Sequence, residues 1–234
     1  MIEIFPTNTC PPNFAELARR SEAFAKFAPC VQLDIDDGVF APEISWPYQE
    51  GQWTELEEMA ARGKALPYSE TLKYEAHLMV EDPLRIGELV ARVGCARVLA
   101  HIETFENEKS AKDAFAAWKS AGAKETGLAI LIDTPLSALG ALVPICDAVQ
   151  VMSIAKLGYQ GAKFDERAIE RVKELHAKYP GLTIEVDGGV SDKNIAELVC
   201  AGARRFGVGS AISRSDNPAD AYSRLKKLAE SAWL

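Results

Sequence analysis

The segment at residues 31–38, VQLDIDDG, holds an unusual concentration of polar side chains in an apolar context. Apolar residues at 31, 33 and 35 alternate with polar residues at 32, 34 and 36, which predicts a β-strand whose polar residues share one face. On that face Gln32, Asp34 and Asp36 could transfer protons or bind a metal ion. The alternative is a strand end exposed to water. Because unpartnered polar groups are costly to bury, we favour the functional interpretation.

Two further residues that could do chemistry lie at the ends of other apolar segments. His77 lies in the segment AHLMV, and Asp187 closes the segment IEVD just before Gly188 and Gly189. His77 is either a hydrogen-bonded core residue or a ligand, and Asp187 either shapes a turn or belongs to a site. If the segments are parallel strands, both side chains would lie at the same end of the sheet as Asp34.

Glycine-rich turns in the C-terminal half of the chain are suited to binding an anion. Glycines let backbone amides approach a phosphate closely, and a helix is expected soon after each turn. The loop 153–164 is longer than its neighbours and is either a plain surface connection or a lid that excludes water. The candidate substrate-binding or phosphate-binding residues are Ser153, Gly158, Gly161, Gly188, Gly189, Gly209 and Ser210.

Strand-like and helix-like segments alternate along the whole chain. We expect strands at 2–5, 30–36, 75–80, 97–102, 126–132, 148–152, 182–187 and 205–208. We expect helices at 13–27, 53–62, 82–94, 108–121, 135–143, 165–178, 192–201 and 218–232.

Eight β/α units with short connections predict parallel pairing and right-handed crossovers. Eight units could wind an open sheet, but eight is also the number that closes a barrel. Asp34, Asp36, His77, His101, Ser153 and Asp187 all fall late in a strand or just after it, where such barrels carry their chemistry. We therefore predict a single (β/α)8 TIM barrel domain over residues 1–234.

Composition excludes several functional classes. The chain has 234 residues, 48% of them hydrophobic and 26% charged, and a net charge of -8, which argues against nucleic-acid or anionic-membrane partners. No apolar stretch approaches the roughly 18 residues of a membrane span, and no secretory leader is evident. The five cysteines are scattered, with no C-x-x-C spacing, and are expected to be reduced. We expect a cytoplasmic protein.

Several blocks of the chain resemble the ribulose-phosphate 3-epimerase family in order and spacing. The matching blocks are Leu33-Asp34-Ile35 with Asp37-Gly38, His77-Leu78-Met79-Val80, Met152-Ser153 followed by Gly158 and Lys163-Phe164, Val186-Asp187-Gly188-Gly189-Val190, and Gly209-Ser210-Ala211-Ile212. The resemblance implies a metal-dependent epimerase of a phosphorylated ketose such as D-ribulose 5-phosphate. It also implies that Asp34 and Asp187 are the acid/base pair, passing a proton through an enediolate, and that His77 is a metal ligand.

The sequence departs from the family at the implied metal site. Gln32 stands where the family has a second ligand histidine, and Asp36 stands where the family has a methionine. Other departures are Pro6-Thr7-Asn8-Thr9-Cys10, Leu131-Ile132-Asp133, one extra residue (Lys156 or Leu157) in the 153–164 loop, and Ala162. Zinc prefers nitrogen and sulfur donors, whereas manganese and magnesium accept oxygen-rich shells.

Three functions follow from this combination. The first is an isomerase acting as a ribulose-phosphate 3-epimerase, with a divalent metal (Zn, Mn, Fe or Mg) weakened or absent and held by Asp34, His77, Asp187, Gln32 and Asp36. The second is a sugar-phosphate-binding relative that has lost the activity. The third, by fold analogy alone, is a decarboxylase or aldolase barrel, which typically needs a lysine where this chain has Asp36. We expect a sugar-phosphate ligand and a homo-oligomer.

Overall fold

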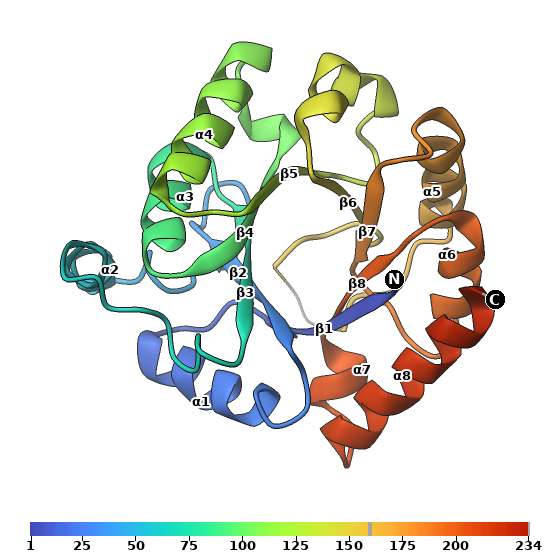
Figure 1. Cartoon of the computed structure of the whole chain (residues 1–234), viewed down its shortest axis with the longest axis horizontal. Coiled ribbons are helices and arrows are strands. Elements are labelled where there is room, and N and C mark those ends of the chain that lie inside the picture. The colour runs from blue at the N-terminus through green and yellow to red at the C-terminus, as the bar shows by residue number, and fades with distance from the viewer. Residues whose placement is uncertain (159–160, 234) are drawn as a thin grey trace.

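The computed structural model describes residues 1–158 and 161–233 and forms a closed barrel of eight parallel strands, in the order β1-β2-β3-β4-β5-β6-β7-β8 (Figure 1). The strands are β1 (Glu3–Asn8), β2 (Cys30–Asp36), β3 (Lys73–Met79), β4 (Cys95–His101), β5 (Glu125–Ile130), β6 (Ala148–Met152), β7 (Thr183–Asp187) and β8 (Arg205–Val208). β1 pairs with β8 and closes the ring. The predicted TIM barrel is confirmed.

Helices surround the strands on the outside of the barrel (Figure 1). They are α1 (Phe14–Phe24), α2 (Gln52–Ala61), α3 (Pro83–Arg92), α4 (Glu108–Ala121), α5 (Arg167–Lys178), α6 (Ile195–Ala201), α7 (Ser210–Ser213) and α8 (Pro218–Trp233), with 3-10 turns η1 (Ile102–Thr104) and η2 (Leu136–Ile145). Among the described residues, none of these helices has the length and apolar character needed to cross a membrane.

Local sequence explains where the helices differ from expectation. The segment expected as a helix at 135–143 is a 3-10 turn interrupted at Gly140, whose φ is 34°. Pro144 has no N–H to donate, so an α-helix cannot continue through it. The helix expected to begin at Asp165 starts at Arg167 instead, and the Asp165 Oδ1 accepts the Arg167 backbone N–H at 3.0 Å.

Alternate residues of β2 face two different environments. Val31, Leu33 and Ile35 belong to the main apolar core together with Leu17 of α1 and Leu56 of α2, so they pack between the strands and the helices. Gln32, Asp34 and Asp36 face the barrel interior and are 0%, 4% and 0% exposed. The interpretation of this segment as a strand end in water is therefore wrong.

The barrel interior below the strand ends is charged. Arg97 of β4 pairs with Glu3 of β1 at 2.6 Å and with Glu75 of β3 at 3.5 Å. Arg205 of β8 pairs with Glu125 of β5 at 2.6 Å. These ion pairs join strands on different sides of the barrel and form the layer on which the polar residues at the carboxyl ends rest.

Candidate active site

Asp34, His77 and Asp187 meet inside the carboxyl end of the barrel. One potential ligand atom from each residue lies within 4.8 Å of the others. Asp34 pairs in register with His77 across β2 and β3, whereas Asp187 reaches them from β7 on the other side of β1 and β8. The arrangement gives two separate carboxylates and one imidazole around a common point, as the strand-end positions in the sequence predicted.

The side chain of Gln32 lies at this common point. Its Nε2 donates to Asp34 Oδ1 at 2.8 Å and to Asp187 Oδ2 at 2.9 Å, and it is 3.3 Å from His77 Nδ1. Its Oε1 is buried and has no hydrogen-bond partner among the described residues. The amide therefore presents its nitrogen to the cluster, where a metal ligand would have to present its oxygen.

Two buried residues complete the surroundings of His77, and neither was among the site residues predicted from the sequence. His101 Nε2 lies 3.0 Å from His77 Nε2, and Gln150 Nε2 lies 3.3 Å from His77 Nδ1. His101 is also 3.2 Å from Glu103 through its Nδ1. His101 ends β4, just as His77 lies near the end of β3. This position was the sequence signal that could have assigned His101 to the site. Gln150 gave no comparable indication.

Burial and neighbouring charges shift the pKa values of this cluster. Burial, reinforced by Asp34, raises the pKa of Asp187 to about 7, although His77 and Gln32 oppose the shift. Burial lowers the pKa of His77, but the Asp34 and Asp187 carboxylates outweigh it and leave a net rise. Burial lowers the pKa of His101 to about 4. A carboxyl that titrates near neutrality is suited to both taking and returning a proton.

Asp36 lies on the same face of β2 but is not part of the three-residue cluster. Both of its carboxylate oxygens are buried without a hydrogen-bond partner among the described residues. Burial raises the pKa of Asp36 to about 7, and the nearby Asp34 carboxylate adds to the rise. The neighbouring Cys10 thiol opposes this rise in the pKa, so Asp36 is a buried acid beside the cluster with a thiol as a polar neighbour.

The predicted glycine turns surround a small pocket above these carboxylates. The pocket has a volume of about 50 Å3 and is lined by Asp34, Asp187, Gly158, Gly161, Gly188, Gly189, Gly209 and Ser210, together with Thr7, Thr9, Met79, Met152, Ile154, Leu157 and Val190. Gly188 and Gly189 have φ values of 108° and 68°. A Cβ at Gly189 would lie 2.8 Å from the backbone nitrogen of Phe164, so this turn requires glycine.

Ser153 is the candidate that the structure does not place on the pocket wall. It is fully buried, and its hydroxyl donates to the backbone oxygen of Asp187 at 3.0 Å. Its backbone nitrogen donates to the same oxygen at 2.8 Å. Ser153 therefore ties the start of the 153–164 loop to the end of β7.

Apolar side chains from the 153–164 loop close the pocket. Ile154 and Leu157 pack with Met79 and Met152 in a small cluster separate from the main core. The remaining volume of about 50 Å3 is far below the roughly 300–1,000 Å3 of ligand pockets. In this structure the pocket is therefore too small for a sugar phosphate, and Ile154 and Leu157 are among the side chains that limit it.

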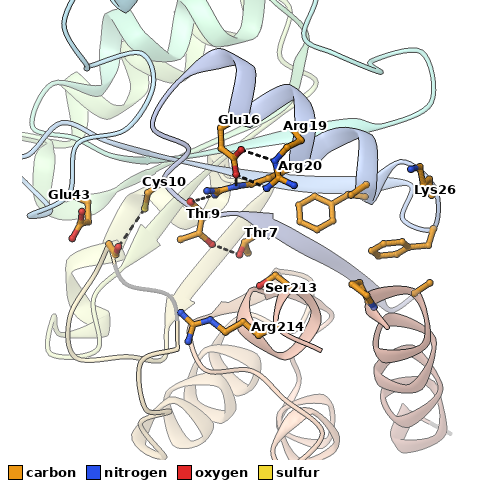
Figure 2. A pocket seen from close by; sticks show the side chains of 16 residues that line it. Thr7, Thr9, Cys10, Glu16, Arg19, Arg20, Lys26, Glu43, Ser213 and Arg214 are labelled. Carbon is orange, nitrogen blue, oxygen red and sulfur yellow. Dashed lines mark hydrogen bonds and ion pairs between the residues drawn. The ribbon is translucent and has the colours of Figure 1, made fainter. Parts of the chain in front are cut away.

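A wider cavity of about 660 Å3 shares Thr7, Thr9 and Gly158 with the small pocket. Figure 2 shows the side chains that line this wider cavity. Arg20 crosses its wall, donating to Glu16 at 2.6 Å and to the backbone oxygen of Thr9 at 2.7 Å. The lining of the wider cavity includes none of the buried carboxylates or histidines, whereas Asp34 and Asp187 line the smaller pocket.

Comparison with known proteins assigns this arrangement to a family. Residues 8–213 match the ribulose-phosphate 3 epimerase family. The chain belongs to this family. It is 33% identical over 209 residues to the ribulose-phosphate 3-epimerase of Aquifex aeolicus, covering 88% of this chain and 86% of that protein. It is 28% identical to the cytoplasmic isoform of Oryza sativa subsp. japonica, covering 93% and 90%.

Solved structures of low sequence identity share the fold of this epimerase-family chain. A structure of KGPDC from Streptococcus mutans has a TM-score of 0.73 at 13% identity and covers 100% of this chain and 99% of that one. The 3-hexulose-6-phosphate synthase of Salmonella typhimurium has a TM-score of 0.70 at 14% identity, with coverage of 99% and 100%.

The epimerase family depends on a divalent metal, and the Asp34–His77–Asp187 cluster could hold one. In this structure the Gln32 amide occupies the space of such an ion, because Nε2 donates to Asp34 Oδ1 at 2.8 Å and to Asp187 Oδ2 at 2.9 Å. Metal–ligand distances are about 2.0–2.2 Å for nitrogen and oxygen donors, so the ion and the amide nitrogen cannot share this space.

Proposed function

We propose that this chain is a ribulose-phosphate 3-epimerase, interconverting D-ribulose 5-phosphate and D-xylulose 5-phosphate or a related pair of ketose phosphates. The observation that carries the proposal is the meeting of Asp34 from β2 and Asp187 from β7 inside one pocket. Inversion at a carbon requires a proton to leave one face and to return on the other, and two separate carboxyl groups supply this.

In the proposed reaction one aspartate takes the proton from the carbon beside the ketone. The electron pair of the broken C–H bond moves into an enediolate, and the other aspartate, in its protonated form, delivers a proton to the opposite face. The carboxyl that began ionised ends protonated, and the carboxyl that began protonated ends ionised. The reverse reaction uses the same two residues with their roles exchanged.

The glycine turns would hold the phosphate of the substrate. Gly188 and Gly189 follow β7, and Gly209 and Ser210 follow β8 at the start of α7. Both turns line the same pocket as the two aspartates, and the turns after strands seven and eight commonly bind phosphate in such barrels. Gly158 and Gly161 would let the lid close over the bound sugar.

We extend the proposal to the metal and to assembly. Gln32 offers only an amide where a histidine would ligate, so a divalent ion (Zn, Mn, Fe or Mg) would bind weakly or not at all. Asp36 could contribute oxygen ligands to such an ion only after reorientation. The 1–234 barrel would act as one domain and assemble as a homo-oligomer, which light scattering on the purified chain would test.

The decisive experiment measures proton exchange at the substrate. Incubation with D-ribulose 5-phosphate in D2O should place deuterium on the carbon beside the ketone and produce D-xylulose 5-phosphate. Asp34→Asn and Asp187→Asn should each lower kcat by about 10²–10⁴-fold, and the double variant should cost little more because the two act as a unit. Binding of the sugar phosphate without exchange would contradict the proposal and indicate a non-catalytic relative.

A further inference from the structure

The amide nitrogen of Gln32 links the two proposed acid/base residues across the barrel. Nε2 lies 2.8 Å from Asp34 Oδ1 and 2.9 Å from Asp187 Oδ2. Asp34 and Asp187 belong to β2 and β7, which are not neighbours in the barrel because β1 and β8 lie between them. One buried nitrogen therefore holds both carboxylates from a single point.

We propose that Gln32 replaces the metal ion in this chain, with its two amide N–H groups holding Asp34 and Asp187 in place so that the site works without a bound divalent cation. The claim that this site is catalytic rests on the proposed epimerase function. The claim that an amide occupies the position of the ion is independent of that function.

The surroundings of the amide determine which end faces the cluster. An amide group has two donors on nitrogen and only acceptors on oxygen, and the choice between them follows from the hydrogen-bond partners. With the amide turned over, Oε1 would face two carboxyl groups of which only one carries a proton in the proposed reaction, so one contact between two acceptors would remain. The nitrogen end instead meets two acceptors.

This orientation leaves the oxygen of Gln32 without a partner in the described part of the chain. Oε1 is buried without a partner among the described residues and lies toward Gly207, where an added Cβ would be 2.8 Å away. An unpartnered buried oxygen is unfavourable, so the two N–H contacts outweigh it.

The first test measures metal in the full chain. The protein is incubated separately with zinc, manganese, iron(II) and magnesium salts, desalted and analysed by mass spectrometry for metals. We expect well below one ion per chain, and an unfolding temperature and deuterium exchange rate that EDTA leaves unchanged. Stoichiometric metal, with exchange abolished by EDTA, would overturn the proposal.

The second test compares two substitutions of Gln32 with the natural chain. Gln32→His should bind zinc at least about 100-fold more tightly than the natural chain, since even outer-shell partners contribute 10–100-fold to metal affinity. Gln32→Met has a similar volume but no N–H, and should lose exchange activity without gaining metal. Added zinc should restore exchange in Gln32→His and not in Gln32→Met.

Gln150→Met is the matched control. Gln150 is a second fully buried glutamine beside His77, and its Nε2 contacts His77 and Met152. Since these contacts hold neither Asp34 nor Asp187, the loss of the amide should leave zinc affinity as low as in the natural chain. Equal zinc affinity in a folded Gln32→His variant and in Gln150→Met would overturn the proposal.

The two proposals fail in distinguishable ways. If the natural chain contains no metal and shows no deuterium exchange, the epimerase function and the metal-free working of the site both fail, and only the occupation of the ion's position by the amide stands. If exchange is present but needs metal, the epimerase function stands and the replacement fails. If Gln32→His does not fold, the metal content and EDTA response of the natural chain still decide the question.

Discussion

Asp36 should make the stability of this protein depend on pH in a specific window. Its side chain is fully buried, and neither carboxylate oxygen has a partner among the described residues. Burial raises its pKa from the ordinary 3.8 to about 7. Since each tenfold change in proton affinity corresponds to about 1.4 kcal/mol, ionising this carboxyl in the folded protein costs roughly 4 kcal/mol.

The sign follows from proton binding in the two states. Between pH 3.8 and about 7 the folded Asp36 is protonated and the unfolded Asp36 is ionised, so the folded state binds more protons. The free energy of unfolding therefore falls as the pH rises through this window and levels off above the folded pKa. Stability from the neutral carboxyl is fully present only below the unfolded pKa.

Asp36→Asn isolates this effect, because asparagine keeps the shape and cannot ionise. Urea unfolding at about pH 4 and about pH 8 should show the variant gaining up to roughly 4 kcal/mol relative to the natural chain between the two conditions. Any constant penalty for burying the new amide cancels in that comparison. Asp216→Asn, at an exposed position, is the control and should show no such change. An equal difference at both pH values would refute the reasoning.

Three further substitutions test the packing around the site and beneath it. Gly207→Ala should reduce kcat/KM while the fold persists by circular dichroism, because its Cβ would lie 2.8 Å from the movable Gln32 Oε1 and 3.1 Å from Asp187 Oδ1. Gly127→Ala should instead destabilise the barrel by about 1–3 kcal/mol in urea, because its Cβ would lie 2.2 Å from the Ala148 backbone oxygen; unchanged stability would contradict this. Burial and the neighbouring Glu75 raise the pKa of Glu185, so the natural chain loses stability as this carboxyl ionises. Glu185→Gln should therefore make the free energy of unfolding less dependent on pH above 4.5.

The barrel and the meeting of Asp34 with Asp187 were predictable because both follow from local pattern. Alternation in residues 31–36 identified the face of β2 that carries Asp34, and the position of Asp187 at the end of a strand placed it at the same end of a parallel barrel. A strand's end and face are local properties. Once eight parallel strands close, the carboxyl-end residues on inner faces must converge, so the meeting of these residues needed no contact information.

The polar layer beneath the site was not predictable in the same way. Arg97 and Arg205 lie in strands far apart in the sequence, and their pairing with Glu3, Glu75 and Glu125 depends on the stagger of the closed barrel. His101 and Gln150 reach the site through the same stagger. A periodic pattern distinguishes the two faces of a strand. It does not show which interior residues of different strands lie at the same level along the barrel axis.

The orientation of the Gln32 amide is the clearest case of a property that the sequence could not provide. As a metal ligand, Gln32 could offer only its carbonyl oxygen. The structure places the nitrogen at the centre because Asp187, 155 residues away, contributes a second acceptor opposite Asp34. The two N–H groups of one amide satisfy both acceptors, whereas its oxygen could accept from neither carboxylate in its ionised form. The substitution that removes the ligand histidine therefore also supplies the group that takes the place of the ion.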